Sequence, residues 1–81
     1  MTIVLSDRAA NAVVDAPGAV QRAFHKQLRF LASGLSHPSL RAKKYDEGRD
    51  IWQVRVNRDW RFYFKIVDDT CYVTDVTPHP K

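Results

Sequence analysis

The stretch from Trp52 to Lys65, WQVRVNRDWRFYFK, decides the fold of this chain. Apolar and polar residues alternate on both sides of a short polar segment, which is the pattern of two β-strands joined by a turn. One face of such a hairpin must be apolar on both strands, and residues that oppose each other share a face. The loop therefore has an odd number of residues, and the segment 57–59 (Asn-Arg-Asp) is predicted to form it.

This loop fixes which residues face each other across the hairpin. The predicted pairs are Val56–Trp60, Val54–Phe62, Arg55–Arg61 and Gln53–Tyr63. The first two pairs lie on the apolar face and the last two on the polar face. Like charges directly opposite each other destabilise a sheet unless something neutralises them, so Arg55 and Arg61 require an anion. A phosphate suits the planar guanidinium fork, whereas the structural alternative is an internal salt bridge to Asp46, Glu47 or Asp50.

The hairpin extends into a larger sheet. Period-two alternation predicts four strands, at residues 40–45, 51–56, 60–67 and 71–76. A two-residue turn at Asp68–Asp69 would place Lys65 opposite Tyr72 and Arg61 opposite Val76. With that register Asp75 points to the apolar face, which conflicts with its charge.

The first half of the chain predicts helices. Residues 2–5 form a short strand, and Ser6 is a good N-cap for a helix that runs to about Val14. Pro17 suits the first position of a second helix, which ends near Gly34. The second helix has one apolar stripe at helical spacing, formed by Val20, Phe24, Leu28 and Leu31. This helical hairpin needs a sheet to cover its apolar face.

Length and composition predict one domain, residues 1–81, with 44% hydrophobic residues to form a core. The single cysteine, Cys71, excludes an internal disulfide and fits a reducing compartment. The apolar run Met1–Leu5 is too short for a signal peptide, and no stretch approaches the ~20 apolar residues of a membrane span. We therefore expect a cytoplasmic protein without contact to a membrane.

The charge is concentrated in the middle of the chain. Residues 21–65 carry eleven Lys or Arg against four Asp or Glu, a net charge of +7, whereas the two flanks are slightly acidic. A basic region of this kind favours a nucleic acid or an acidic protein as partner, although a solvated basic surface has the same composition.

Few other residues are candidates for proton transfer, anion binding or metal binding. His79 follows the last strand between two prolines, and the strand direction returns it close to Trp60 and Arg61, where an imidazole could transfer a proton. His25 and His37 are more typical of surface positions. Lys43 and Lys44 lie on the preceding strand, and alternation sends only one of them to the arginine face. The three separated histidines and one cysteine do not form a metal site, and no cofactor motif is present.

Three segments resemble the RelE/ParE superfamily of toxins from bacterial type II toxin–antitoxin systems. They are residues 37–44 (HPSLRAKK), residues 51–64 (IWQVRVNRDWRFYF) and the terminal pair Pro78–His79. The central hairpin is most similar to the HigB branch. The resemblance implies an α+β fold in which a short N-terminal strand and a helical hairpin pack on a curved four-stranded antiparallel sheet.

The resemblance also implies a function, that of a ribosome-dependent endoribonuclease that cuts mRNA and is neutralised by a cognate antitoxin. By position in the motifs, the implied catalytic residues are Arg61, Arg55 and His79, and Lys43 or Lys44 falls near the position of basic residues in RelE-like members. Tyr63 and Lys65 lie on the same polar face of the hairpin as the two arginines. The predicted RNA-binding residues are therefore Lys43, Lys44, Tyr63 and Lys65. No metal or other cofactor is implied. Two alternatives stay open, because the ParE branch has the same fold but inhibits DNA gyrase, and a degenerate member would only bind its antitoxin.

Overall fold

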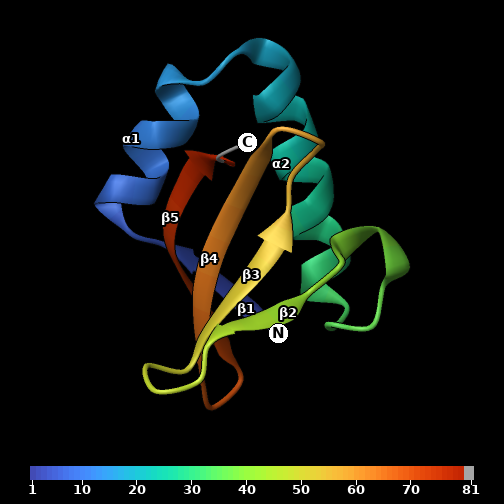
Figure 1. Cartoon of the computed structure of the whole chain (residues 1–81), viewed down its shortest axis with the longest axis vertical. Coiled ribbons are helices and arrows are strands. Elements are labelled where there is room, and N and C mark those ends of the chain that lie inside the picture. Colours follow the sequence, from blue (N-terminus) through green and yellow to red (C-terminus); the bar gives the residue numbers. More distant parts are fainter. Residues whose placement is uncertain (80–81) are drawn as a thin grey trace.

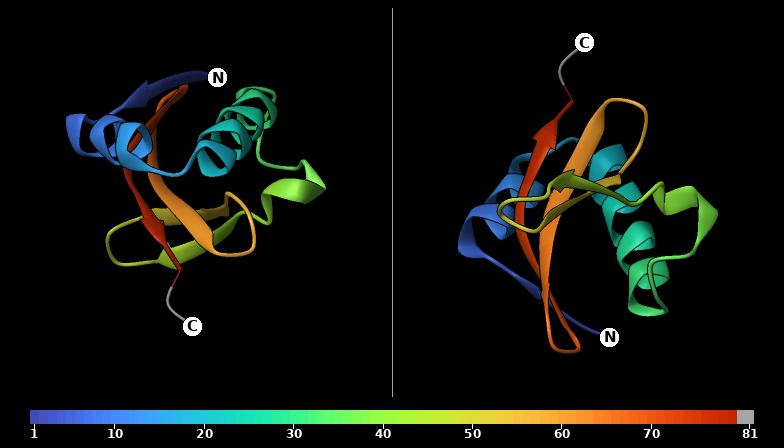
Figure 2. Two further views of the ribbon diagram at one scale, coloured as in Figure 1. Left: turned by 90° about the horizontal axis from the view of Figure 1, so that it is seen from above. Right: turned by 60° about the horizontal axis from the view of Figure 1, so that its bottom comes forward.

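Two helices pack on one face of a five-stranded sheet in the computed structural model, which describes residues 1–79 (Figure 1). The elements are β1 (Thr2–Leu5), α1 (Asp7–Asp15), α2 (Gly18–Ala32), the 3-10 helix η1 (Pro38–Leu40), β2 (Lys43–Asp46), β3 (Ile51–Arg55), β4 (Trp60–Val67) and β5 (Thr70–Pro78). The strand order is β1-β5-β4-β3-β2. Seen from above, both helices lie on the same side of the curved sheet (Figure 2). No helix in this part of the chain is long and apolar enough to cross a membrane.

The predicted α+β fold is confirmed, but the sheet has five strands rather than four. The short strand β1 joins it by pairing in parallel with β5, from Thr2 opposite Thr70 to Leu5 opposite Val73. The other three pairs of neighbouring strands are antiparallel. Without β1, β5 would be an edge strand with a row of unpaired backbone groups, and β1 satisfies them.

The predicted strand at residues 40–45 begins later than expected. Pro38–Leu40 form η1, and Arg41 then adopts a left-handed backbone with φ 47°. The left-handed backbone of Arg41 is not extended, and pairing with β3 begins only at Lys43. The later start of β2 matters for the candidate site described below, since it determines where the Arg41 side chain lies.

The helix ends follow the prediction, except that Pro17 is the N-cap of α2 and not its first residue. The Ser6 hydroxyl accepts a hydrogen bond from the backbone N–H of Ala9 at 3.0 Å, so Ser6 is the N-cap of α1. Helix α2 begins directly after Pro17 and ends at Ala32. Gly34 follows with φ 129°, a conformation that favours glycine and stops the helix.

The core lies between the helices and the sheet. Phe24 of α2 contacts Phe62 of β4 edge to face, with ring centroids 5.3 Å apart. The fully buried side chains of largest volume are Phe24, Phe62, Phe64, Leu31, Leu40, Val54, Val73 and Cys71. Burial raises the pKa of the Cys71 thiol to about 12, so this cysteine stays protonated near neutral pH and is not a nucleophile.

The register of the central hairpin is confirmed, with Arg55 opposite Arg61 and Val54 opposite Phe62. Further along the sheet, Lys65 lies opposite Tyr72 as predicted. Arg61 lies opposite Thr77, however, so the predicted pairing with Val76 is wrong.

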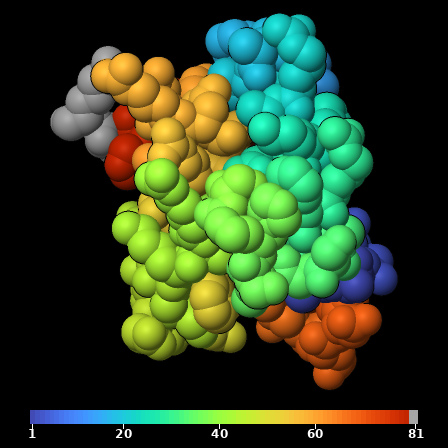
Figure 3. Space-filling model, turned by 90° about the vertical axis from the view of Figure 1, so that its right-hand side faces the viewer, coloured from blue at the N-terminus to red at the C-terminus, as the bar shows by residue number. Residues whose placement is uncertain are grey.

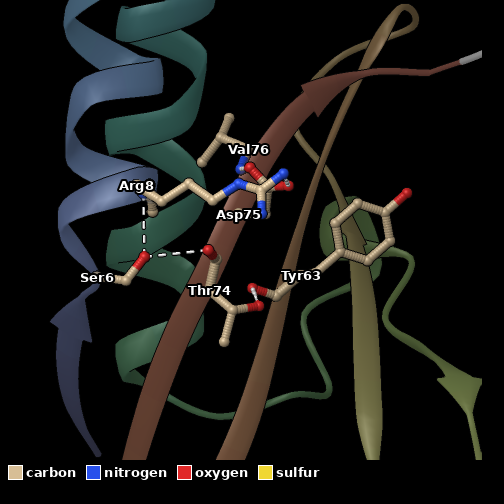
Figure 4. A network of polar contacts seen from close by, with 7 residues as sticks. Ser6, Arg8, Tyr63, Thr74, Asp75 and Val76 are labelled. Atoms are coloured by element: carbon tan, nitrogen blue, oxygen red, sulfur yellow. Dashed lines mark hydrogen bonds and ion pairs between the residues drawn. The ribbon is translucent and has the colours of Figure 1, made fainter.

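The cause is a bulge in β5 that inserts Thr74 between the partners of Tyr63 and Phe64. The Thr74 hydroxyl donates to the Tyr63 carbonyl at 3.3 Å, and the Thr74 carbonyl accepts from the Ser6 hydroxyl at 3.0 Å (Figure 4). The extra residue turns Asp75 away from the core. Outside the core, the Asp75 carboxylate pairs with the Arg8 guanidinium at 3.4 Å. The bulge thereby removes the conflict over the charge of Asp75.

Candidate functional site

A pocket of about 300 Å³ lies on the face of the sheet that the helices leave open. We call it the basic pocket, and its lining residues are Arg41, Lys43, Gln53, Arg55 and Arg61. Four of the five carry a positive charge and none carries a negative one. Such a pocket is complementary to an anion with several acceptor oxygens.

Several elements bring these side chains together. Arg55 and Arg61 face each other across β3 and β4, and Lys43 lies opposite Gln53 across β2 and β3. Arg41 enters from the left-handed turn after η1. In the space-filling view the segment with η1 and β2 (green) lies beside α2 (teal) and below the loop after β3 (orange) (Figure 3). Arg41 was not predicted as a site residue, because the predicted strand at residues 40–45 gave it an ordinary extended backbone.

Arg61 is held by the loop that precedes it. Its Nη1 donates to the carbonyl oxygens of Asn57 at 2.7 Å, Trp60 at 2.9 Å and Arg58 at 3.3 Å. The Asn57 side chain in turn accepts hydrogen bonds from the backbone N–H groups of Asp59 and Trp60, both at 3.0 Å. The three-residue loop therefore fixes the orientation of the guanidinium group.

The internal salt bridge that was the alternative explanation for the two arginines is not observed in the part of the chain that the structure describes. Asp46 pairs with Arg49, and Asp50 pairs with Lys44. Within residues 1–79, no ion pair includes Arg55 or Arg61. The repulsion between the two opposed guanidinium groups is thus not offset by a carboxylate from the described part of the chain, which leaves the basic pocket ready for an external anion.

A buried glutamine supports the pocket from the core side. The side chain of Gln27 on α2 is only 3% exposed, and its Nε2 donates to the carbonyl oxygens of Arg55 at 2.7 Å and Ser39 at 2.8 Å. The Ser39 hydroxyl donates back to Gln27 Oε1 at 3.3 Å. One side chain therefore ties η1 to the end of β3 and so positions Arg41 and Arg55. This role could not be predicted from the sequence, since an amide on a helix is usually exposed.

Replacing Gln27 by leucine is expected to lower the free energy of unfolding by about 1–3 kcal/mol, because two partly buried carbonyl oxygens lose their donor. Chemical denaturation followed by tryptophan fluorescence measures the loss. Gln21→Leu is the matched control, since Gln21 on the same helix donates to the carbonyl oxygens of Val14 and Ala16 near the surface. Equal losses for the two variants would contradict the role of Gln27.

His79 lies at the end of β5, beside the loop that holds Arg61. Its backbone N–H donates to the carbonyl of Asp59 at 2.6 Å, which continues the pairing by one step beyond Pro78 opposite Trp60. Because Thr77 opposes Arg61, His79 is a diagonal neighbour of Arg61, and such neighbours are separated by about 7–8 Å. The His79 side chain is exposed and is not among the residues that line the basic pocket.

The remaining predicted site residues divide between the two faces. Lys43 reaches the basic pocket, whereas Lys44 lies opposite Trp52, with its Nζ 4.7 Å from the centre of the indole ring. Tyr63 lies beside the pocket and its hydroxyl accepts a hydrogen bond from Gln53 at 3.1 Å. Lys65 is exposed two residues further along β4 and does not line the pocket.

The other two histidines lie away from this face. His25 is exposed on α2, and the ring of His37 stacks on Phe30 with centroids 3.7 Å apart. Among residues 1–79 there is no group of three or more His, Cys, Asp or Glu side chains that could hold a metal ion.

Comparison with solved structures identifies the fold. No protein-family model and no curated protein sequence matches the chain. The YoeB/ParE toxin from Agrobacterium tumefaciens superposes with a TM-score of 0.81 at 10% identity, covering 99% of this chain and 100% of that chain. RelE in the archaeal RelE-RelB complex from Pyrococcus horikoshii OT3 gives 0.79 at 16% identity, covering 95% and 92%. The isolated E. coli RelE toxin gives 0.79 at 14% identity, covering 99% and 85%. The chain therefore has the same fold as these RelE and YoeB/ParE toxin structures.

Proposed function

We propose that this chain is the toxin of a type II toxin–antitoxin module and cleaves mRNA on the ribosome as an endoribonuclease. The observation that carries the proposal is the basic pocket. Two opposed arginines, with Arg41 and Lys43 beside them, form an anion site on a fold shared with known toxins. A phosphodiester of RNA has the charge and the acceptor oxygens that such a site binds.

The reaction that fits these groups is attack of a ribose 2′-hydroxyl on the adjacent phosphorus. The P–O5′ bond breaks, which leaves a 2′,3′-cyclic phosphate and a 5′-hydroxyl. Arg55 and Arg61 would stabilise the negative charge of the phosphorane, since cations aimed at developing charge lower the barrier. His79 is the histidine nearest to Arg61 along the sheet and would transfer a proton to or from the reacting oxygens.

The partner of the free toxin would be an antitoxin. Several solved structures with this fold contain one, including the YoeB-YefM complex of Staphylococcus aureus, which superposes with a TM-score of 0.77 at 13% identity. For this chain, an acidic segment of an antitoxin would be attracted to the basic pocket and would exclude RNA from it. Coexpression with the protein encoded by a neighbouring reading frame should then restore growth.

The decisive experiment expresses the chain without a partner and maps mRNA ends in a translating extract. We expect new ends within translated regions, and we expect them to disappear when ribosomes are omitted. Intact mRNA together with DNA-damage signalling would instead assign the gyrase-inhibitor function. Absence of growth arrest would identify a chain that only binds its antitoxin.

The two adjacent lysines provide a sharper test. Lys43→Ala should lower the cleavage rate by about tenfold, because it removes one of the cations that contact the phosphate. Lys44→Ala should leave the rate unchanged, because its ammonium group lies over Trp52 and pairs with Asp50. Primer extension on one reporter mRNA compares the two variants. Each variant loses one lysine side chain, and the two positions are adjacent in the chain. A larger loss for Lys44→Ala would contradict the assigned site.

A further inference from the structure

A second pocket lies beside the basic pocket on the open face of the sheet. Its volume is about 370 Å³, and we call it the tyrosine pocket. The lining residues are Arg8, Tyr45, Arg49, Ile51, Tyr63, Thr74 and Asp75. The rings of Tyr45 and Tyr63 meet edge to face at 4.9 Å, and Tyr45 is 60% exposed. Two aromatic rings and the side chain of Ile51 therefore offer apolar surface to a ligand, next to the polar side chains of the pocket.

The charges of this pocket are balanced, in contrast to those of the basic pocket. Arg8 pairs with Asp75 across the bulge in β5 (Figure 4). Arg49 pairs with Asp46, and the backbone N–H of Arg49, followed by its guanidinium, lowers the pKa of the Asp46 carboxyl. Since each arginine has a carboxylate partner, the tyrosine pocket favours a flat, uncharged group with donors and acceptors rather than a free anion.

The two pockets are joined by one hydrogen-bonded pair of residues. Gln53 lines the basic pocket, Tyr63 lines the tyrosine pocket, and Gln53 Nε2 donates to the Tyr63 hydroxyl at 3.1 Å. The two residues are direct partners across β3 and β4. Directly opposed residues in a sheet are separated by about 5 Å, so a single ligand can occupy both pockets.

We infer that the tyrosine pocket is a nucleobase subsite, which holds a base of the RNA strand whose phosphate occupies the basic pocket. Tyr45 and Tyr63 would stack on the base, and Asp75 and Thr74 would offer an acceptor and a hydroxyl to its edge. A nucleotide has a charged phosphate and an uncharged aromatic base, which matches a cationic pocket next to a balanced aromatic one. The inference rests on the proposed function, since it requires that RNA binds this face.

The test measures binding of a fluorescein-labelled 2′-O-methyl RNA tetranucleotide, which lacks the attacking hydroxyl, by fluorescence anisotropy. An abasic oligonucleotide of the same length is the second probe. Tyr45→Ala should weaken binding of the RNA by about tenfold, since stacking on one aromatic ring contributes on that scale. The same variant should bind the abasic probe as the wild type does. Tyr45→Phe, which keeps the ring, should retain RNA affinity.

Tyr72→Ala is the matched control, because Tyr72 is also exposed, at 43%, on the same sheet but lines neither pocket. The subsite is wrong if Tyr45→Ala binds RNA as the wild type does while Lys43→Ala loses affinity; in that case the proposed function stands. Equal weakening of the binding of both probes by Tyr45→Ala would also overturn the nucleobase subsite, because Tyr45 would then contact the sugar-phosphate backbone of the oligonucleotide and not a base. If the wild type binds neither probe, the subsite is wrong, whereas the proposed function, which requires the ribosome, is decided by the mapping of mRNA ends in the translating extract.

Discussion

Arg61→Ala is expected to lower the rate of mRNA cleavage by about 10²–10³-fold. In the proposed reaction the Arg61 guanidinium meets charge that develops on the phosphorane, and loss of one such donor has an effect of this size. Its three hydrogen bonds to loop carbonyls hold it in place before the substrate arrives. Quantitative primer extension in a translating extract, at equal toxin concentrations, measures the loss.

The effect of a loosened 57–59 loop on the cleavage rate must be distinguished from the effect of losing the positive charge of Arg61. Arg61→Lys keeps the positive charge but not the planar fork, and should recover only part of the rate. Arg58→Ala removes an exposed arginine from the same loop without touching the basic pocket, and should cleave like the wild type. Thermal unfolding of all three variants shows whether each is folded. Equal cleavage patterns for the wild type and a folded Arg61→Ala variant would exclude a catalytic role for Arg61.

Phe62→Ala is expected to reduce the free energy of unfolding by about 3–5 kcal/mol, because it opens a cavity in the centre of the core. Phe62 is 0% exposed and packs edge to face against Phe24 of α2, so it joins the helix layer to the sheet. Small domains are stable by only about 5–15 kcal/mol in total. A large fraction of this variant should therefore unfold on mild heating, which calorimetry or urea denaturation detects.

The comparison variants for Phe62 separate burial from aromatic content. Phe62→Leu keeps most of the buried volume and should lose less stability than the alanine variant. Tyr72→Ala removes an exposed ring from the neighbouring strand and should change stability by a fraction of that amount. Similar losses for Phe62→Ala and Tyr72→Ala would contradict the assignment of Phe62 to the core.

The central hairpin shows how much of the site could be predicted from the sequence. Alternation along residues 52–65 and the need for one apolar face determined the loop length, and the loop length determined that Arg55 opposes Arg61. These are local constraints, because each concerns residues that are near neighbours in the chain. The N-cap at Ser6 and the stop at Gly34 are local in the same sense, and all of them were confirmed.

Other features of the site depend on contacts between residues that are far apart in the chain. Thr74 bulges out of β5 where Ser6 binds its carbonyl, which turns Asp75 toward Arg8. Gln27 becomes a buried support for Arg55, a residue 28 positions away.

The same holds for the outline of the basic pocket. The turn after η1 selects Arg41 and Lys43, rather than Lys44, for its wall. Pattern within a strand cannot reveal such contacts, because a bulge or a buried amide is stabilised by its distant partner and not by its own neighbours. The pair of opposed arginines therefore follows from local sequence pattern, whereas the pocket around them depends on the packing of distant segments.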